Sequence, residues 1–170
     1  REGLQLVPVF HFNAPLPALE QQRLVGGDAA NGITLFDLQG DSRIPTLRDA
    51  SSSVSIYNPL DRRVQTAWSD VMREFMNRYQ GHGTSLGGVG FLYSKDALQV
   101  LPGQSWGSDA FTLQRFQQDM EWAKDEDVDW FARLLNSENR DAWLSWRQTQ
   151  MSNWMSELQE ICQTSGPVYL

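Results

Sequence analysis

The stretch from Ser53 to Ser94 constrains the fold of this chain most, because it combines a helix start, a long amphipathic helix, a helix stop and a strand. Asn58 has a side-chain oxygen suited to capping a helix, and Pro59 suits the first helical position, where its missing N–H costs no hydrogen bond. Apolar residues then recur with helical spacing at Val64, Trp68, Val71, Phe75 and Tyr79. Gly81 ends the pattern, so we expect one long helix that buries this face.

The residues that follow this helix predict a buried strand. Gly87 to Tyr93 carries no charge, as expected of a strand covered on both faces. Leu4 to Phe12 and Val168 to Leu170 have the same apolar character, although Pro8 removes one ladder donor from the former. Strands that alternate with helices imply parallel pairing through right-handed crossovers. The sequence therefore predicts an α/β fold with parallel strands.

Three further helices are expected, and the acidic run at residues 125 to 129 favours the start of another at residues 130 to 135. The first spans residues 18 to 25, and Ser108 caps the second, whose apolar face consists of Leu113, Phe116 and Met120. The longest runs from Asn136 or Ser137 to about Gln163. Its apolar stripe, which is typical of core packing, consists of Trp143, Trp146, Met151, Trp154, Leu158 and Ile161.

The segment between the first two helices has a weaker pattern. Residues 33 to 38 resemble a small strand, and residues 48 to 53 resemble a polar loop. A connection this long between a strand and its crossover helix is more typical of a functional rim than of a bare linker.

Composition excludes several classes of function. The 170 residues carry a net charge of −7, which argues against nucleic acid as a partner. No apolar run approaches the roughly 20 residues of a membrane span. The single cysteine, Cys162, excludes an internal disulfide. The two histidines are too few for a histidine metal centre, and we expect no cofactor. The chain starts without methionine and stops in a strand, so we expect one domain, incomplete at both ends, completed by the remainder of a longer chain.

Polar and aromatic residues follow the predicted strands. His11 and Asn13 come at the end of the first strand, Tyr93 ends the central one, and Trp106 lies near the tip of the loop that follows. Ligands bind at the carboxyl ends of parallel strands, because loops converge there. His11 is equally consistent with a core histidine held by one backbone hydrogen bond.

The common catalytic motifs are missing from the sequence. It has no G-x-S-x-G elbow, Walker loop, H-E-x-x-H pair or dinucleotide-binding glycine pattern. Carboxylates and aromatic side chains remain, which is the combination typical of proteins that act on carbohydrates.

Several motifs in this context resemble those of glycoside hydrolases. Asn58-Pro59-Leu60-Asp61, Arg78-Tyr79, Gly81-His82 and Leu86-Gly87-Gly88 resemble a crossover of the clan-A (β/α)8 enzymes of the β-galactosidase type. Residues 101 to 107, Arg115-Phe116 and residues 142 to 147 are similar to family-10-like glycosyl hydrolases. The resemblance covers residues 57 to 147. It implies part of a (β/α)8 TIM barrel, a saccharide as ligand, hydrolysis of O-glycosyl bonds and an extracytoplasmic location.

The sequence departs from this family at the catalytic acid. Active members end the central strand with Asn-Glu, whereas this chain has Tyr93, Ser94 and Lys95 there. Neither serine nor lysine can protonate a leaving oxygen as the glutamic acid does. Asp96 is the nearby carboxylate, and it is therefore the candidate catalytic residue.

Three hypotheses follow. The first is a carbohydrate-active barrel segment with His11, Asn13, Tyr93, Asp96 and Trp106 at the saccharide cleft. The second is a related barrel without catalysis that binds a saccharide or a protein. The third is a stand-alone α/β interaction module that uses its acidic face.

Overall fold

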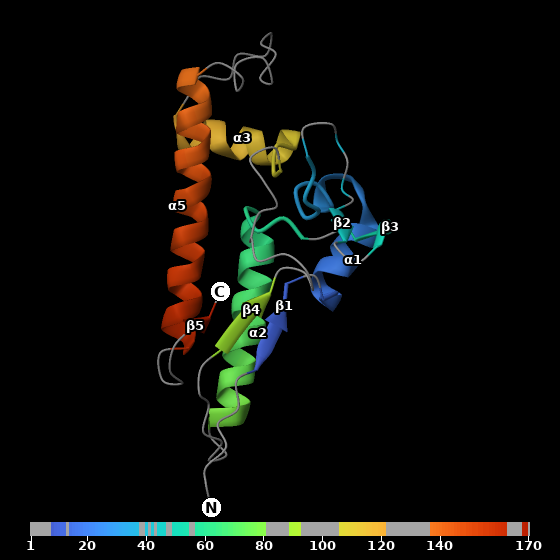
Figure 1. Ribbon diagram of the computed structural model, residues 1–170, viewed down its shortest axis with the longest axis vertical. Coiled ribbons are helices and arrows are strands. Elements are labelled where there is room, and N and C mark those ends of the chain that lie inside the picture. The colour runs from blue at the N-terminus through green and yellow to red at the C-terminus, as the bar shows by residue number, and fades with distance from the viewer. Residues whose placement is uncertain are drawn as a thin grey trace, which may run out of the picture.

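The computed structural model describes residues 8–12, 14–37, 40, 42, 44–46, 49–54, 57–80, 89–92, 106–121, 137–162 and 168–169. Four α-helices dominate this part of the chain (Figure 1). They are α1 (Pro17–Val25), α2 (Arg62–Gln80), α3 (Ala110–Asp119) and α5 (Ser137–Cys162), with 9, 19, 10 and 26 residues. A single 3-10 turn, η1 (Gly27–Ala29), follows α1.

The strands are short and fall into two groups. β1 (Val9–His11), β4 (Val89–Leu92) and β5 (Val168–Tyr169) form a parallel sheet in the order β1-β4-β5. β2 (Ile44–Thr46) and β3 (Asp49–Val54) form a separate antiparallel hairpin, where a loop was predicted for residues 48 to 53. The predicted strand at residues 33 to 38 is only an isolated bridge between Thr34 and Tyr57.

The predicted fold class, an α/β segment of a (β/α)8 TIM barrel, is wrong. The three predicted strands pair in parallel, but they contain only 3, 4 and 2 residues, whereas strands typically have about 5 to 6. The described part of the chain is mostly helical, and its buried residues come mainly from helices packed on one another. Short apolar runs caused the error, because an apolar run indicates burial but does not by itself decide which secondary structure the segment forms. Ile33 and Leu35, for example, are fully buried outside any strand.

The larger core lies between α2 and α5, which run side by side (Figure 1). Phe12, just after β1, lies between two indoles, with ring centroids 5.1 Å from Trp68 of α2 and 4.9 Å from Trp154 of α5. The predicted apolar face of α2 is rotated relative to the buried one. The buried hydrophobic residues of α2 are Val64, Trp68, Met72 and Met76. Tyr79, by contrast, is 40% exposed.

A second core joins α3 to the first half of α5. Phe116 of α3 lies 5.2 Å from Trp143 and 5.5 Å from Trp146, and these two indoles stack on each other. Leu113 and Leu60 complete the cluster. The sequence predicted Leu113 and Phe116 correctly, but Met120 is exposed because α3 ends before it.

Both helix starts differ from the prediction. Asp61, not Asn58, caps α2: its carbonyl accepts the first helical bond from Gln65, and its Oδ1 accepts the N–H of Arg63 at 2.8 Å. Asp109, not Ser108, caps α3 by accepting the N–H of Thr112 at 3.0 Å. Carboxylates suit both positions because the helix dipole is positive at its N-terminus.

Asn58 instead joins three segments of the chain. It is fully buried, and its N–H donates to the carbonyl of Ile33 at 2.8 Å. Its Oδ1 accepts the N–H of Leu60 at 3.0 Å, while its Nδ2 donates to the Thr112 hydroxyl at 2.8 Å. The segment around Ile33, the start of α2 and the start of α3 are therefore held by one amide.

The structure adds two observations on the cysteine and on the helices. Cys162 is buried, and this burial raises the pKa of its thiol to about 11. Among the described residues, no helix has both the length and the apolar character that a membrane crossing requires.

The network around Asn58 gives a stability prediction. Asn58→Ala should lower the free energy of unfolding by about 3 kcal/mol, because the buried N–H of Leu60 loses its acceptor and a small cavity forms. The matched control is Asn77→Ala on the exposed side of α2, which should change stability by less than about 0.5 kcal/mol. Urea denaturation measures both. Equal midpoints for the two variants would show that the amide network contributes little.

Candidate functional site: a pocket between α1 and α3

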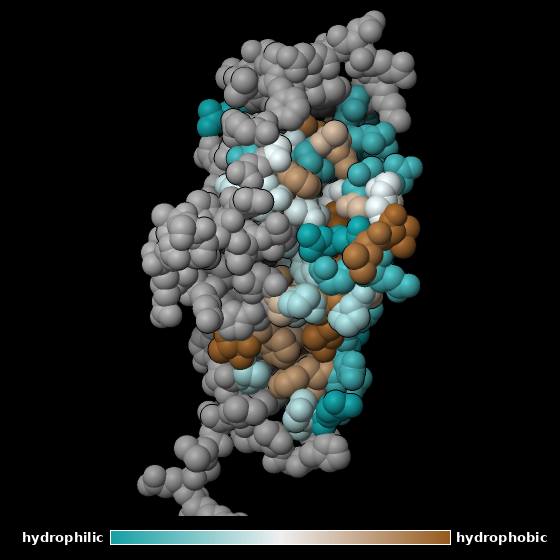
Figure 2. All heavy atoms as spheres, turned by 90° about the vertical axis from the view of Figure 1, so that its right-hand side faces the viewer, coloured by the Kyte–Doolittle hydropathy of each residue, from teal (hydrophilic) through white to brown (hydrophobic). Residues whose placement is uncertain are grey.

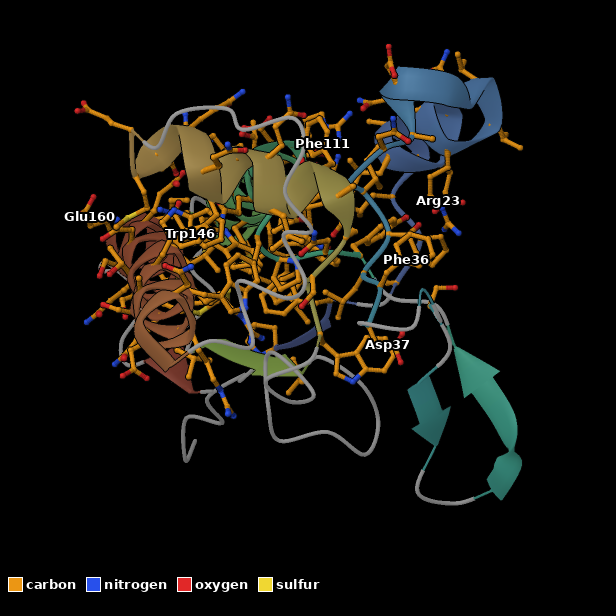
Figure 3. All side chains as sticks on the ribbon, turned by 90° about the horizontal axis from the view of Figure 1, so that it is seen from above. Arg23, Phe36, Asp37, Phe111, Trp146 and Glu160 are labelled. Atoms are coloured by element: carbon orange, nitrogen blue, oxygen red, sulfur yellow. The ribbon has the colours of Figure 1, made fainter. Side chains whose placement is uncertain are left out.

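A pocket of about 510 Å³ lies between the end of α1, the segment after η1 and the start of α3. Its lining combines two phenyl rings with amide, hydroxyl and charged groups. The lining residues are Arg23, Ala30, Asn31, Gly32, Thr34, Phe36, Asp109, Ala110, Phe111 and Gln114. Arg23 reaches from α1 towards Phe36, while Phe111 lies at the start of α3 (Figure 3).

Gly32 allows the ring of Phe111 to lie against the backbone. Its φ is +81°, and an added Cβ would lie 2.4 Å from Cδ1 of Phe111 and 2.9 Å from Oδ2 of Asp61. No other residue type fits this position without displacing the ring, because a side chain strains the left-handed backbone and also meets the phenyl group.

Arg63 holds the loop that carries Gly32. Its guanidinium forms a bidentate pair with Asp61, at 2.7 Å and 3.0 Å, and donates to the carbonyl oxygens of Ala29, at 2.8 Å, and Asn31. Hydrogen bonding to Asp61 raises the pKa of Arg63. The same guanidinium lies 5.4 Å from the centre of the Phe111 ring, a cation–π distance. One side chain therefore fixes both the loop and the aromatic wall.

Asp109 contributes a carboxylate that the fold already uses. Its Oδ1 caps α3, and its Oδ2 accepts the hydroxyl of Thr112 at 2.7 Å and the amide of Asn58 at 3.4 Å. This carboxylate can accept bonds from a ligand, but its orientation is set by the helix start. The opposite wall is fixed as well, because the carbonyl of Phe36 accepts the N–H of Gly107 at 2.7 Å.

Arg23 is held by a buried tyrosine acting through a glutamate. Tyr57 accepts the N–H of Leu16 at 2.8 Å and donates its hydroxyl to Oε1 of Glu20 at 2.5 Å. The same Oε1 accepts Nη1 of Arg23 at 3.0 Å. The bond from Tyr57 lowers the pKa of Glu20, whereas burial and then the bond to Glu20 raise the pKa of Tyr57 to about 12.

The structure does not assemble the predicted site among the residues it describes. Trp106 is half-buried against the core between α2 and α5 and does not line the pocket. His11 is in β1, with its backbone paired to Leu92, and its side chain is outside the described part. Asn13, Tyr93 and Asp96 also lie outside the described residues, so their predicted roles stay predictions.

Sequence reasoning missed the residues that do form a pocket. Only the length of the connection between residues 19 and 53 pointed to this region, as a functional rim. The Asn31-Gly32 dipeptide is a turn signal that marks where the backbone reverses beside Phe111. The sequence around Phe111 does not indicate a binding site, because a phenylalanine in the first turn of a helix is usually interpreted as part of the hydrophobic core.

The pocket is equipped for binding more than for metal chemistry. Within the part of the chain that the structure describes, no group of three or more histidine, cysteine or acidic side chains is placed to hold a metal ion. The lining instead offers amides and a hydroxyl, which both donate and accept hydrogen bonds.

The shifted tyrosine gives a spectroscopic prediction. In a pH titration followed at the tyrosinate absorbance, one of the four tyrosines should ionise near pH 12, and Tyr57→Phe should remove that step. Because the folded pKa is raised above 10.0, the neutral hydroxyl contributes stability below pH 10 that is lost as the pH rises towards 12. Glu20→Gln should lower the pKa of Tyr57 only partly, since burial is the larger cause. An ordinary titration of all four tyrosines would contradict the buried hydrogen bond.

The contact between Gly32 and Phe111 gives a second prediction. Gly32→Ala should destabilise the chain by about 2 to 3 kcal/mol, because it combines backbone strain with a steric clash. Gly27→Ala is the matched control, since Gly27 also has a positive φ, +58°, but nothing lies within 4 Å of its added Cβ. It should cost only about 1 kcal/mol. Chemical denaturation of both variants checks the difference, and equal losses would mean that the ring does not rest on Gly32.

Comparison of the chain with protein-family models, with curated proteins and with solved structures finds no match. The resemblance to glycoside hydrolases therefore stays a prediction from sequence motifs.

Proposed function

We propose that this chain binds a saccharide in the pocket between α1 and α3. The observation that carries the proposal is the pairing of two phenyl rings, Phe36 and Phe111, with side chains that both donate and accept hydrogen bonds. A sugar ring has the complementary surface, with apolar C–H faces and a rim of hydroxyl groups.

The aromatic part of the pocket suits the faces of a sugar ring. Phe111 is 41% exposed, although its ring is fixed by Gly32 and Arg63. The face of an aromatic ring is electron-rich and attracts the weakly positive hydrogens of a C–H bond. A phenyl ring that is rigid and also exposed therefore offers a stacking surface without a large cost in side-chain entropy.

The polar part of the pocket suits hydroxyl groups. A hydroxyl donates one hydrogen bond and accepts others, so it is best met by groups with the same double capacity. Asn31, Thr34 and Gln114 have that capacity, Arg23 adds donors, and Asp109 adds acceptors. The volume of about 510 Å³ lies within the range of about 300 to 1,000 Å³ that is common for small-molecule sites.

The surrounding surface fits a small polar ligand better than a broad protein interface. On the side of the molecule that carries α1, hydrophilic residues surround the hydrophobic ones in the upper half, whereas a separate group of hydrophobic residues lies in the lower half (Figure 2). Leu24 and Val25 are strongly exposed, but they are two neighbouring residues at one helix end. Protein interfaces are built around larger central apolar areas.

Hydrolysis of the bound saccharide is a separate matter. The candidate acid Asp96 lies outside the described residues, so the prediction of an O-glycosyl hydrolase stays a prediction from the sequence. The proposal for this pocket is therefore binding.

A calorimetric experiment tests the proposal. The chain is titrated with cellobiose, maltose, lactose and xylobiose at millimolar concentrations, and at least one of them should bind. Phe111→Ala should weaken that binding about tenfold or more, because the stacking surface is lost. Tyr79→Ala, which removes an aromatic ring of equal exposure from α2, is the matched control and should bind as the wild type does.

Two outcomes would contradict the proposal. Absence of binding by every saccharide would remove the function itself. Binding that is unchanged in Phe111→Ala but lost in Tyr79→Ala would place the site elsewhere on the molecule.

A further inference from the structure

We propose that the pocket selects neutral saccharides over the corresponding uronic acids, and that Tyr57 sets this preference by positioning Arg23 through Glu20. This inference rests on the proposed saccharide binding and names the class of saccharide. It depends on how the charges beside the pocket are paired.

Among the described residues that line the pocket, Arg23 is the cationic one. A guanidinium has five N–H donors in a planar fork, and the bond to Glu20 is made from one nitrogen, Nη1, at 3.0 Å. Arg23 keeps a side-chain exposure of 35% and reaches towards Phe36 (Figure 3). The geometry suits donation of two hydrogen bonds to a pair of adjacent hydroxyl groups.

Among the described residues, the charges around the pocket give no surplus for an acidic ligand. Glu20 offsets Arg23 at 3.0 Å, and Asp61 offsets Arg63 at 2.7 Å. Asp109 adds a further carboxylate to the lining, at the position where α3 would otherwise present its positive end. A uronate would thus lose solvation and place its charge near more described carboxylates than cations, while the charge of Arg23, the cation it could reach, is already offset by Glu20.

Tyr57 is the positioning residue of this arrangement. It is 3% exposed, and its hydroxyl is held by the N–H of Leu16 while it donates to Glu20. Glu20 is more than a third exposed, so burial alone does not fix its carboxylate. The fixed hydroxyl holds the carboxylate beside Arg23, so the guanidinium keeps both its orientation and its neutralising partner.

Matched sugars test the selectivity. Methyl glucoside and methyl galactoside are compared by titration with methyl glucuronide and methyl galacturonide, which differ in one carboxylate. The wild type should bind the neutral member about fivefold more tightly, the size of one charge interaction at a partly exposed site.

Three variants separate positioning from general stability. Glu20→Gln should move the neutral-to-acidic ratio to one or below, because the charge of Arg23 loses its offset. Tyr57→Phe should also lower the neutral-to-acidic ratio, because Glu20 loses the hydroxyl that holds it beside Arg23. If Tyr57→Phe folds poorly, Glu20→Gln at the surface still tests the charge pairing. Glu74→Gln makes the same change in net charge at an exposed pair with Arg78 on α2, and it should leave the ratio as in the wild type.

The outcomes distinguish this inference from the proposed function. If no saccharide in the calorimetric panel and none of these glycosides binds, the proposed function fails. If saccharides bind but the uronides bind as tightly as the neutral sugars, or if Glu20→Gln and Glu74→Gln shift the ratio equally, the inference fails while saccharide binding stands.

Discussion

The arrangement of this molecule depends on a single buried amide. Asn58 is fully buried, and its backbone and side chain bind the segment at Ile33, the N–H of Leu60 and the hydroxyl of Thr112. A buried amide that lacks partners is costly, so only an arrangement that brings all three segments to Asn58 is stable. The two walls of the pocket, on the segment after η1 and on α3, are therefore fixed to one point.

Two glycines beside this amide make the close approach possible. An added Cβ at Gly32 would meet Phe111, and one at Gly107 would lie 2.9 Å from Cδ1 of Leu60 and 4.0 Å from Oδ1 of Asn58. Both residues have positive φ, so the backbone conformation and the lack of space favour glycine for separate reasons. The pocket exists where backbone segments approach closely, and its rings are held by that approach.

Sequence patterns predicted the helices well and the rest of the fold poorly. The helix predicted up to Gln163 ends at Cys162, and the helix predicted over residues 18 to 25 begins at Pro17. These bounds differ from the predicted ones by one residue, because helical periodicity is a local signal that sequence records well. The three strands pair in parallel but are short, with 3, 4 and 2 residues, since packing and not pattern decides which residues pair. The pocket escaped prediction because its partners are distant in sequence: 54 residues separate Asn58 from Thr112, and 37 separate Glu20 from Tyr57. No local pattern records such pairs.

Attachment of α1 links stability to recognition. α1 buries one residue, Leu19. Hydrogen bonds from Tyr57 to Leu16 and Glu20 attach α1 to the segment that precedes α2. A helix with so little buried surface opens at a lower free energy than the core between α2 and α5. A ligand that contacts Arg23 on α1 and Phe111 on α3 bridges this weakly held helix to a firmly held one, so binding must stabilise the docked state of α1 by mass action. Tyr57 orients Arg23 and also holds α1 in place, so a change of Tyr57 alone cannot separate the two roles. A change of Glu20 alters the charge of its pair with Arg23 but keeps the burial of Leu19 and the hydrogen bond between Tyr57 and Leu16.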